Sequence, residues 1–387
     1  MKLPFGLARA FALTFAITAA PSPARAQATT ADGFALPQPG RKFVFPRDHG
    51  SHPEFKIEWW YLTGHLYATN STMGTPPRRF GFQATFFRRA APRAGGPGIE
   101  SANFGTGNIY LAHMALLDVT TGRFFHEERL NREGWDAGSA TNSLAVHNGN
   151  WSLRLTDPVT NRMDLSGGIR AEVRFQLSLV PRKPLVVFGT NGVSRKAAEP
   201  EAASHYLTYP RLATQGTLSL GRETLAVAGE AWMDHEISSS QLGEGQVGWD
   251  WACLQLNDGR ELMTYRMRRS DGSTDPFSSL SWVDASGRVV QQSARTFQWD
   301  PLAQWTSPHT RAVYPAGVRL TAADPIDGRR RTFTLEPLAA DQELNGAGGG
   351  VPYWEGSCRV RDEAGREIGQ AFLEMTGYAG SLRRTLE

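Results

Sequence analysis

Apolar and polar residues alternate along most of this 387-residue chain in short runs that end at turns. A Gly after polar turn formers, placed between two apolar runs, is the short-range signature of a β-hairpin. It occurs in DVTTGRFF, QLNDGREL, RRSDGST, VDASGRVV and RDEAGREI. No window keeps a 3.6-residue apolar period for more than about two turns. The pattern therefore predicts antiparallel β-structure with few, short helices.

The expected strands follow one another closely. They cover residues 56–68, 79–88, 109–118, 123–130, 151–156, 170–180, 213–220, 224–234, 248–257, 260–269, 279–284, 316–322, 331–337, 351–360 and 367–377. So many strands at this spacing are typical of sandwiches or barrels and not of a βαβ fold. We expect long loops at the Pro/Gly/Ala-rich stretch 90–100, at the polar stretch 190–205 and at AADQELNGAGGG, 339–350.

The first 26 residues have the pattern of a secretory signal peptide. Lys2 and Arg9 flank the start, an apolar run covers 10–20, and Ala24-Arg25-Ala26 forms a small-x-small cleavage site before Gln27. The apolar run is too short for a membrane-spanning helix, and no later segment is apolar enough. We therefore predict cleavage after Ala26 and a soluble periplasmic or secreted protein.

Composition removes one class of partner and leaves a question about the cysteines. The full chain has 41 Lys and Arg against 38 Asp and Glu, and the predicted signal holds three basic and no acidic residues. The mature chain then has no formal net charge, so charge gives no reason to expect a nucleic-acid partner. An exported chain permits a disulfide between Cys253 and Cys358, but each lies in an apolar strand-like run, which favours two separately buried thiols.

One buried acid is expected in KIEWWYLTGHL, residues 56–66. Alternation along a strand places Glu58 and Trp60 on one face, and Ile57, Trp59 and Tyr61 on the other. The face of Glu58 is otherwise apolar. Its carboxyl is therefore either a site with a raised pKa or a structural group held by an Arg or by backbone N–H groups.

A second polar group lies in GEAWMDHEISSS, residues 229–240. Trp232 and Asp234 share one face of the expected strand, and His235 lies on the other. Polar clusters at a barrel rim can reach a ligand, although a purely structural hydrogen-bonded cluster is an equal alternative. Asp250 follows in GWDWACLQL, again on an otherwise apolar face.

Other motifs carry less weight. In IYLAHMALLD, His113 has the pattern of a core histidine. G-x-S-x-G and the Gly-rich phosphate loops do not occur in the sequence, so no nucleophilic serine or nucleotide cofactor is indicated. The segment PRDHGSHPEF reads as a loop without helical metal-ligand spacing, and we predict no metal site. Its four potential ligands are Asp48, His49, His52 and Glu54.

Four separated motifs resemble the AttH-like, carotenoid 1,2-hydratase superfamily of lipocalin-like proteins over residues 45–380. They are FPRDHGSHPEFKIEWWYLTGHL, YLAHMALLD, GEAWMDHE with GWDWACLQLNDGRELMTYRMR, and YWEGSCRV with FLEMTGY. The resemblance implies an all-β protein of two lipocalin-like units packed together, which we place at 36–228 and 229–387. It also implies a pocket for apolar molecules, and on the sequence we expect no cofactor. Members include hydratases, but secreted members lack a demonstrated substrate.

Hydratase chemistry sets requirements that these residues can be tested against. Protonation of an alkene needs a carboxylic acid kept neutral by apolar surroundings and aromatic faces near the resulting cation. A second group must deprotonate the attacking water. The resemblance suggests Asp234 or Asp250 as the acid and His235 as the base, with Glu58 less certain. The expected ligand-binding side chains are Trp60, His113, Trp232, Trp249, Trp251 and Tyr265.

The sequence thus predicts an exported protein that binds a hydrophobic small molecule or isoprenoid-like lipid and acts on it as a hydratase or hydrolase. The rival is a non-catalytic lipid or metabolite carrier that serves an ABC-type envelope transporter. A carbohydrate-binding module would also use the aromatic residues, but it predicts tryptophans exposed on a flat face.

Overall fold

The computed structural model describes residues 28–70, 76–91, 93, 107–346, 350–380 and 382. The predicted signal segment and most of the predicted loop 90–100 lie outside the described residues. Within them the chain is almost entirely β-structure, and the described helix is the single 3₁₀ turn η1 (Arg47–His49). Both the expectation of an all-β chain and that of few, short helices are confirmed for this part of the molecule.

The first sheet holds thirteen strands, antiparallel throughout, and rolls into a nearly closed barrel. Its main order is β4-β3-β2-β1-β13-β12-β9-β8-β7-β6-β5, with β10 and β11 paired to β12. Where the two ends of the sheet approach each other, Asn131 of the edge strand β4 donates a hydrogen bond to Asn148 of β6, the neighbour of the other edge strand β5. The strands are β1 (Ile57–Ala68), β2 (Arg79–Arg89), β3 (Ile109–Asp118), β4 (Arg123–Arg132), β5 (Ala137–Ser139), β6 (Ala145–Asn148), β7 (Trp151–Asp157), β8 (Arg162–Ile169), β9 (Val173–Pro181), β10 (Val186–Phe188), β11 (Ser194–Arg195), β12 (Ala203–Leu220) and β13 (Glu223–Ser240).

The second sheet has ten strands in the main order β17-β16-β15-β14-β25-β24-β22-β21-β18, and β23 pairs with β24. A separate hairpin is formed by β19 (Gln304–Thr306) and β20 (Val313–Pro315). The sheet strands are β14 (Gln246–Leu256), β15 (Glu261–Arg269), β16 (Ser279–Val283), β17 (Val289–Ser293), β18 (Phe297–Pro301), β21 (Val318–Ala323), β22 (Arg330–Pro337), β23 (Glu343–Leu344), β24 (Tyr353–Arg361) and β25 (Glu367–Met375).

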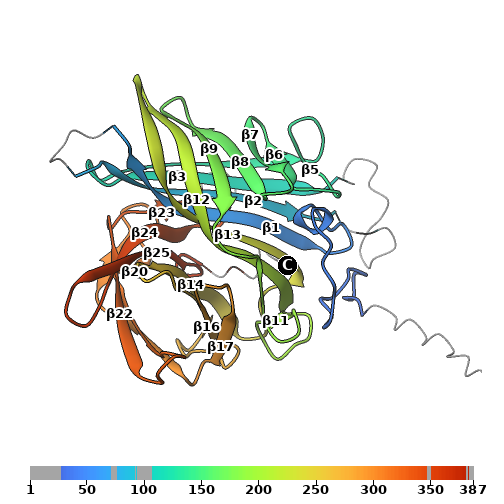
Figure 1. Cartoon of the computed structure of the whole chain (residues 1–387). Coiled ribbons are helices and arrows are strands. Elements are labelled where there is room, and N and C mark those ends of the chain that lie inside the picture. Colours follow the sequence, from blue (N-terminus) through green and yellow to red (C-terminus); the bar gives the residue numbers. More distant parts are fainter. Residues whose placement is uncertain are drawn as a thin grey trace, which may run out of the picture.

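The two sheets lie against one another, with the first sheet above the second in Figure 1. Each has its own apolar interior, and a third apolar cluster fills the space between them. Gly81 of β2 allows a close approach, because a Cβ there would lie 2.3 Å from Ser357 Oγ of β24. Across the same interface Gln255 donates to the carbonyls of Pro210 and Ala231 at 2.9 and 3.0 Å.

This arrangement explains why β1 is apolar on both faces. Trp60 and Leu62 point into the interior of the first barrel. Trp59 and Tyr61, which alternate with them, belong to the cluster between the sheets. A strand buried on two sides needs apolar residues at nearly every position, and the burial pattern of β1 shows this.

Most of the expected strands are present, and the differences have simple causes. The predicted polar loop 190–205 contains β11 and the start of β12, where the polar side chains of Ser194 and Ser204 are buried and hydrogen-bonded to Tyr265 and Glu236. Strand β8 was not predicted, because polar and Gly residues weaken its alternation. Strand β13 pairs with β1 and β12, so the first sheet extends to Ser240, and the expected unit boundary at 228/229 falls inside this strand.

The cysteines are both free and buried. Cys253 belongs to the cluster between the sheets, whereas Cys358 points into the interior of the second sheet. Since they lie in different cores, the alternative of two separate thiols is the correct one.

Candidate functional site

A cavity of about 310 Å³ lies between the two sheets. Its wall combines the outer face of the first barrel, mainly β1, β2, β3, β12 and β13, with β14, β15, β24 and β25 of the second sheet. The lining is mostly apolar and aromatic, and a few polar groups converge on it, as is usual for small-molecule pockets. The aromatic side chains in the wall are Trp59, Tyr61, Phe87, Tyr206, Trp249, Trp251, Tyr265 and Tyr353.

Asp234 is a carboxyl that the first barrel presents to this cavity. Its side chain is 3% exposed. Thr208 and Trp232 donate hydrogen bonds to Oδ1 at 2.6 and 2.7 Å, and the Tyr206 hydroxyl donates to Oδ2 at 2.6 Å. Burial raises the pKa of Asp234 to about 7, although these three hydrogen bonds act in the opposite direction. The side chain therefore exists in both protonation states near neutral pH, which suits acid–base work.

Register explains why these donors surround Asp234. On β12, Thr208 is the cross-strand partner of Asp234, and Tyr206 is the partner of Glu236 two residues further along β13. Trp232 precedes Asp234 by two positions, so strand alternation places it on the same face. The Tyr206 hydroxyl also accepts a hydrogen bond from Trp251 of β14 at 3.0 Å, which joins the two sheets at the site.

Glu236 and Lys196 form an ion pair in the same wall. Lys196 Nζ lies 2.6 Å from Glu236 Oε2, which also accepts a hydrogen bond from Ser204. The ammonium group lies 5.0 Å from the ring centroid of Tyr206 and 5.3 Å from that of Tyr265. Aromatic faces attract a cation at this distance, so the rings help to hold the lysine beside the cavity.

The second sheet adds two further carboxyls. Glu355 of β24 and Glu374 of β25 are direct cross-strand partners. Tyr61 of β1 donates a hydrogen bond to Glu355 Oε1, and Glu355 Oε2 has no hydrogen-bond partner in the described chain. Burial raises the pKa of Glu374 to about 8. Burial and the neighbouring Glu374 carboxylate also raise the pKa of Glu355 well above its ordinary value.

His113 lies in the cavity wall on β3, as expected of a ligand-binding residue, and not in the barrel interior. Its Nδ1 is 2.8 Å from the Tyr353 hydroxyl, to which Gln83 also donates at 2.7 Å. Burial lowers the pKa of His113 to about 3, so the ring is neutral at physiological pH. Its Nε2 has no hydrogen-bond partner among the described residues.

His235 and Glu58 lie away from the cavity, at one end of the first barrel. His235 Nε2 is 3.0 Å from Glu58 Oε1, and the His235 ring stacks on Trp60. Burial opposes ionisation of Glu58, but hydrogen bonds from His235 and His52 and the charge of Arg88 hold its pKa well below the usual range. Glu58 is thus a paired structural carboxylate, which is the second of the two readings that its sequence context allowed.

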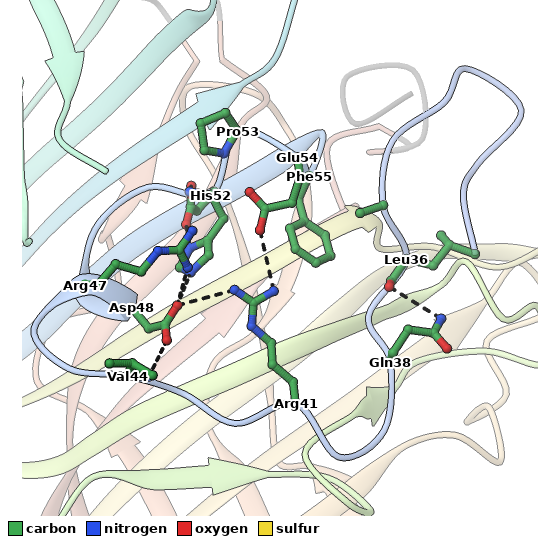
Figure 2. A network of polar contacts seen from close by, with 12 residues as sticks. Leu36, Gln38, Arg41, Val44, Arg47, Asp48, His52, Pro53, Glu54 and Phe55 are labelled. Atoms are coloured by element: carbon green, nitrogen blue, oxygen red, sulfur yellow. Dashed lines mark hydrogen bonds and ion pairs between the residues drawn. The ribbon is translucent and has the colours of Figure 1, made fainter. Parts of the chain in front are cut away.

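The segment before β1 covers this end of the barrel. His52 bridges the carboxylates of Glu58 and Asp48 through its two ring nitrogens, at 2.8 and 2.9 Å. Figure 2 shows Asp48 at the centre of contacts with Arg41, Arg47 and His52. The motif PRDHGSHPEF therefore builds a hydrogen-bonded cap over the barrel.

Donor atoms of His52, Glu58 and His235 lie within 4.8 Å of one another, a spacing that a metal ion could use. The same atoms are already joined by hydrogen bonds, and Arg88 Nε lies 3.2 Å from Glu58 Oε2. A positive guanidinium beside the shared carboxylate opposes the binding of a cation. The donor set fits a hydrogen-bonded network better than a metal centre.

Asp250 also serves the structure. It accepts hydrogen bonds from Arg266 at 2.9 Å, from Arg268 at 3.1 Å and from Tyr378 at 3.0 Å. Its side chain is buried among these groups and does not line the cavity. Its oxygens are held by these three donors, and its place outside the cavity wall gives no support to a role as the acid of a hydratase.

Comparison with known proteins agrees with the fold. The family model described as AttH-like matches residues 36–378. The chain belongs to the AttH-like family. The crystal structure of a protein assigned to AttH from Nitrosomonas europaea superposes with a TM-score of 0.77 and 32% identity, over 89% of this chain and 99% of that one.

Two further structures share the fold of this AttH-like protein at lower identity. Kievitone hydratase from Nectria haematococca has a TM-score of 0.63 and 15% identity, over 90% of this chain and 98% of that one. CghA, solved with Sch210972, has a TM-score of 0.52 and 11% identity, over 91% and 98%. No curated protein matches the chain. In the described part of the AttH-like chain, no helix is both long and apolar enough to span a membrane.

The cavity brings together only some of the residues predicted for the site. Asp234, His113, Trp249, Trp251 and Tyr265 line it. Trp232 lies behind the wall and supports Asp234. The other four, Glu58, Trp60, His235 and Asp250, lie elsewhere, and their predicted roles at the ligand have no geometric support.

Two polar groups that line the cavity, Lys196 and Glu374, were missed, as was Glu355 beside Glu374. Lys196 fell in a stretch predicted to be a loop. Glu355 and Glu374 are each a lone acid in an apolar strand, within YWEGSCRV and FLEMTGY. That is the same signal that drew attention to Glu58 and Asp250, so it could have identified them.

Proposed function

We propose that this AttH-like protein binds a small hydrophobic molecule between its two sheets and adds water to a carbon–carbon double bond of it. The observation that carries the proposal is Asp234. It is a buried carboxyl with no ion-pair partner in the described chain and a pKa raised to about 7, and it faces an aromatic cavity. Such a group can donate a proton to an alkene at neutral pH.

The proton and electron balance can be written with Asp234 alone. The Asp234 O–H bond breaks, and its proton bonds to one alkene carbon, while the π electrons leave a cation at the other carbon. The three hydrogen bonds to Asp234 stabilise the carboxylate that forms. A water oxygen then bonds to the cationic carbon, and the water proton returns to Asp234. This cycle does not require His235, whose Nε2 is engaged with Glu58.

Aromatic rings support the same reaction. The cation would form beside Trp251, Tyr206 and their neighbours, whose π faces stabilise positive charge. Apolar side chains such as Leu111 and Met267 complete the lining and would hold the body of the ligand. Cavity and rings together favour a small hydrophobic substrate.

The alternative function is carriage without chemistry. It is favoured by the position of His235, since the expected partner base lies outside the cavity. In this case the same cavity would hold a lipid or metabolite, and Asp234 would serve only as a hydrogen-bonding group. Both the enzyme and the carrier would be exported after cleavage at Ala26. The ABC-type transporter as a partner stays a prediction from the sequence.

Native mass spectrometry of the protein purified from its own host tests ligand binding. We expect a mass increment from a lipophilic ligand, lost on extraction with organic solvent. Recovery of ligand-free protein that also fails to bind an apolar fluorescent dye would exclude the pocket. With the ligand identified, an increment of 18 mass units would be sought after incubation, with Asp234→Asn as the inactive variant. Asp164→Asn on the exposed face of β8 is the matched control. Binding without this increment would favour the carrier.

A further inference from the structure

Three buried carboxyls at or beside the cavity lack the ion-pair partner that other buried acids of this protein have; the fourth, Glu236, is paired with Lys196. Glu58 is paired with Arg88, and Glu261 with Lys183 and Arg211. Glu355, Glu374 and Asp234 have no ion-pair partner among the residues that the structure describes; neutral donors such as Tyr61 and Trp249 hold them instead. When these carboxyls lose their protons, no ion-pair partner in the described chain balances the charge that forms.

Glu355 shows the imbalance most clearly. It is 1% exposed, and its Oε2 has no hydrogen-bond partner in the described chain. Strand alternation places its side chain on the same face of β24 as Tyr353, which lines the cavity. Its cross-strand partner Glu374 lines the cavity directly. A buried oxygen without a partner is costly, so this wall is prepared for a group that the protein does not supply.

Aromatic rings surround the same space. Trp59 and Tyr61 of β1, and Trp249 and Trp251 of β14, line the cavity on both sides. The Tyr61 and Trp251 rings meet edge to face, with centroids 5.2 Å apart. Ring faces combined with carboxyls form a recognised binding environment for organic cations.

We propose that the wall built from Glu355, Glu374 and the aromatic rings binds a lipophilic cation, an ammonium group carried on an apolar body. One positive charge would balance the acidic wall, and the apolar body would occupy the rest of the cavity. The lysine of the pocket does not meet this need, because Lys196 is already paired with Glu236. The inference rests on the ligand pocket of the proposed function and names its ligand class. It also agrees with a reaction that passes through a carbocation, since an ammonium ion has the same charge.

The pH dependence of binding follows from the same groups. A cation favours the ionised carboxyls, so its affinity should rise with pH as Asp234 and Glu374 lose protons, with pKa values of about 7 and 8. His113 is already neutral in this range, because burial lowers its pKa to about 3.

The remaining polar groups of the wall fall into two kinds. Tyr61, Tyr206 and Tyr353 stay protonated, because burial raises their pKa well above 10. The others carry hydrogen bonds or fixed contacts. On β2, Arg88 is paired with Glu58, and Arg89 also lines the cavity. On β15, the Tyr265 hydroxyl shares a hydrogen bond with the Ser194 hydroxyl. The positive charges of the two arginines act on the cation probe alone, and they are the same in the wild type and in the glutamine variants compared below.

Two probes of nearly equal shape test the inference. Benzyltrimethylammonium carries the charge, and neopentylbenzene has carbon in place of nitrogen. Their dissociation constants would be measured from the quenching of tryptophan fluorescence at pH 6 and pH 9. At pH 9 we expect the cation to bind about tenfold more tightly than the neutral probe, with the preference nearly absent at pH 6.

Variants assign the preference to this wall. Glu374→Gln and Glu355→Gln should each remove most of the preference for the cation and leave binding of neopentylbenzene within about twofold. The exposed Asp164→Asn variant is the control for a general loss of negative charge. Circular dichroism would establish that each variant folds. If one glutamine variant does not fold, the other variant and the pH series on the wild type still test whether this wall binds the cation.

The outcomes separate the two proposals. Equal affinity for both probes at pH 9, or a preference that persists in both glutamine variants, overturns the cation site and leaves the apolar pocket intact. Binding of neither probe overturns the pocket itself and with it the proposed function. A cation preference that rises with pH and depends on the two glutamates supports the inference.

Discussion

Asp234 and His235 are consecutive residues of β13, yet their side chains lie on opposite faces of the first sheet. Asp234 faces the cavity between the sheets, and His235 reaches Glu58 at the end of the barrel, with Nε2 3.0 Å from Oε1. A strand turns successive side chains to opposite sides, so two neighbours cannot act on one small ligand. Of the two residues that the motif DHE suggests as a catalytic pair, Asp234 is therefore placed for chemistry at the cavity and His235 for a structural contact with Glu58.

Substitutions at the two positions should differ accordingly. We expect Asp234→Asn to fold and bind an apolar ligand but to lower turnover by about 10²–10⁴-fold, because the amide cannot donate a proton to the alkene. His235→Gln should instead lower the thermal midpoint and leave the turnover of the folded fraction within a few-fold. Turnover per folded molecule, paired with thermal denaturation, checks both. Loss of turnover in a fully folded His235→Gln variant would contradict the structural role assigned to His235.

The pH dependence of stability provides a test that needs no substrate. The folded pKa of Asp234, about 7, lies above its ordinary value of 3.8, so the folded state binds the proton more tightly. Its contribution to the free energy of unfolding is fully present below pH 4 and is lost as pH rises to about 7, at no more than about 1.4 kcal/mol per pH unit. Glu374 acts alike up to about pH 8.

Buried histidines such as His113 act in the opposite direction, so the comparison must use a variant. The stability of wild type relative to Asp234→Asn should fall between pH 4 and pH 7 and stay level above it. Urea denaturation at half-unit steps of pH measures this difference. A difference that does not change with pH would mean that Asp234 is an ordinary ionised carboxylate in the folded state.

The sequence was sufficient for much of the fold and for part of the site. Hairpin turns and alternation locate most strands, because these are local signals. Local signals do not show which of the two buried faces of a strand adjoins a ligand, because this depends on how the second sheet packs on the first. For this reason Trp60 and Trp59 could not be told apart, and the acids Glu58 and Asp250 could not be distinguished from Glu374. Each is a carboxyl in an apolar strand, and only the arginines that the fold brings to Glu58 and Asp250 distinguish them.

Tyr206→Phe tests the hydrogen bonds around Asp234. The Tyr206 hydroxyl donates to Oδ2 at 2.6 Å, and this bond favours the carboxylate. Its loss should raise the pKa of Asp234 by about one unit, and the alkaline limb of the pH–activity profile should shift upward by the same amount. Tyr265→Phe is the matched control, because that hydroxyl lines the cavity but bonds to Ser194 and the Arg195 carbonyl. An unshifted limb in Tyr206→Phe would show that another group supplies the proton.

Glu58→Gln tests the structural role of the barrel cap. The substitution removes the charge that Arg88 and two histidines surround in a fully buried site, and it leaves Arg88 without its ion-pair partner. We expect a loss of about 3–5 kcal/mol in the free energy of unfolding at pH 7, measured by urea denaturation. Because the folded pKa of Glu58 lies below its ordinary value of 4.5, this difference should hold at all higher pH values and shrink as pH falls below 4.5. The exposed Glu223→Gln variant should change stability by less than about 0.5 kcal/mol. A Glu58→Gln protein that keeps its stability but loses turnover would return this carboxylate to the active site.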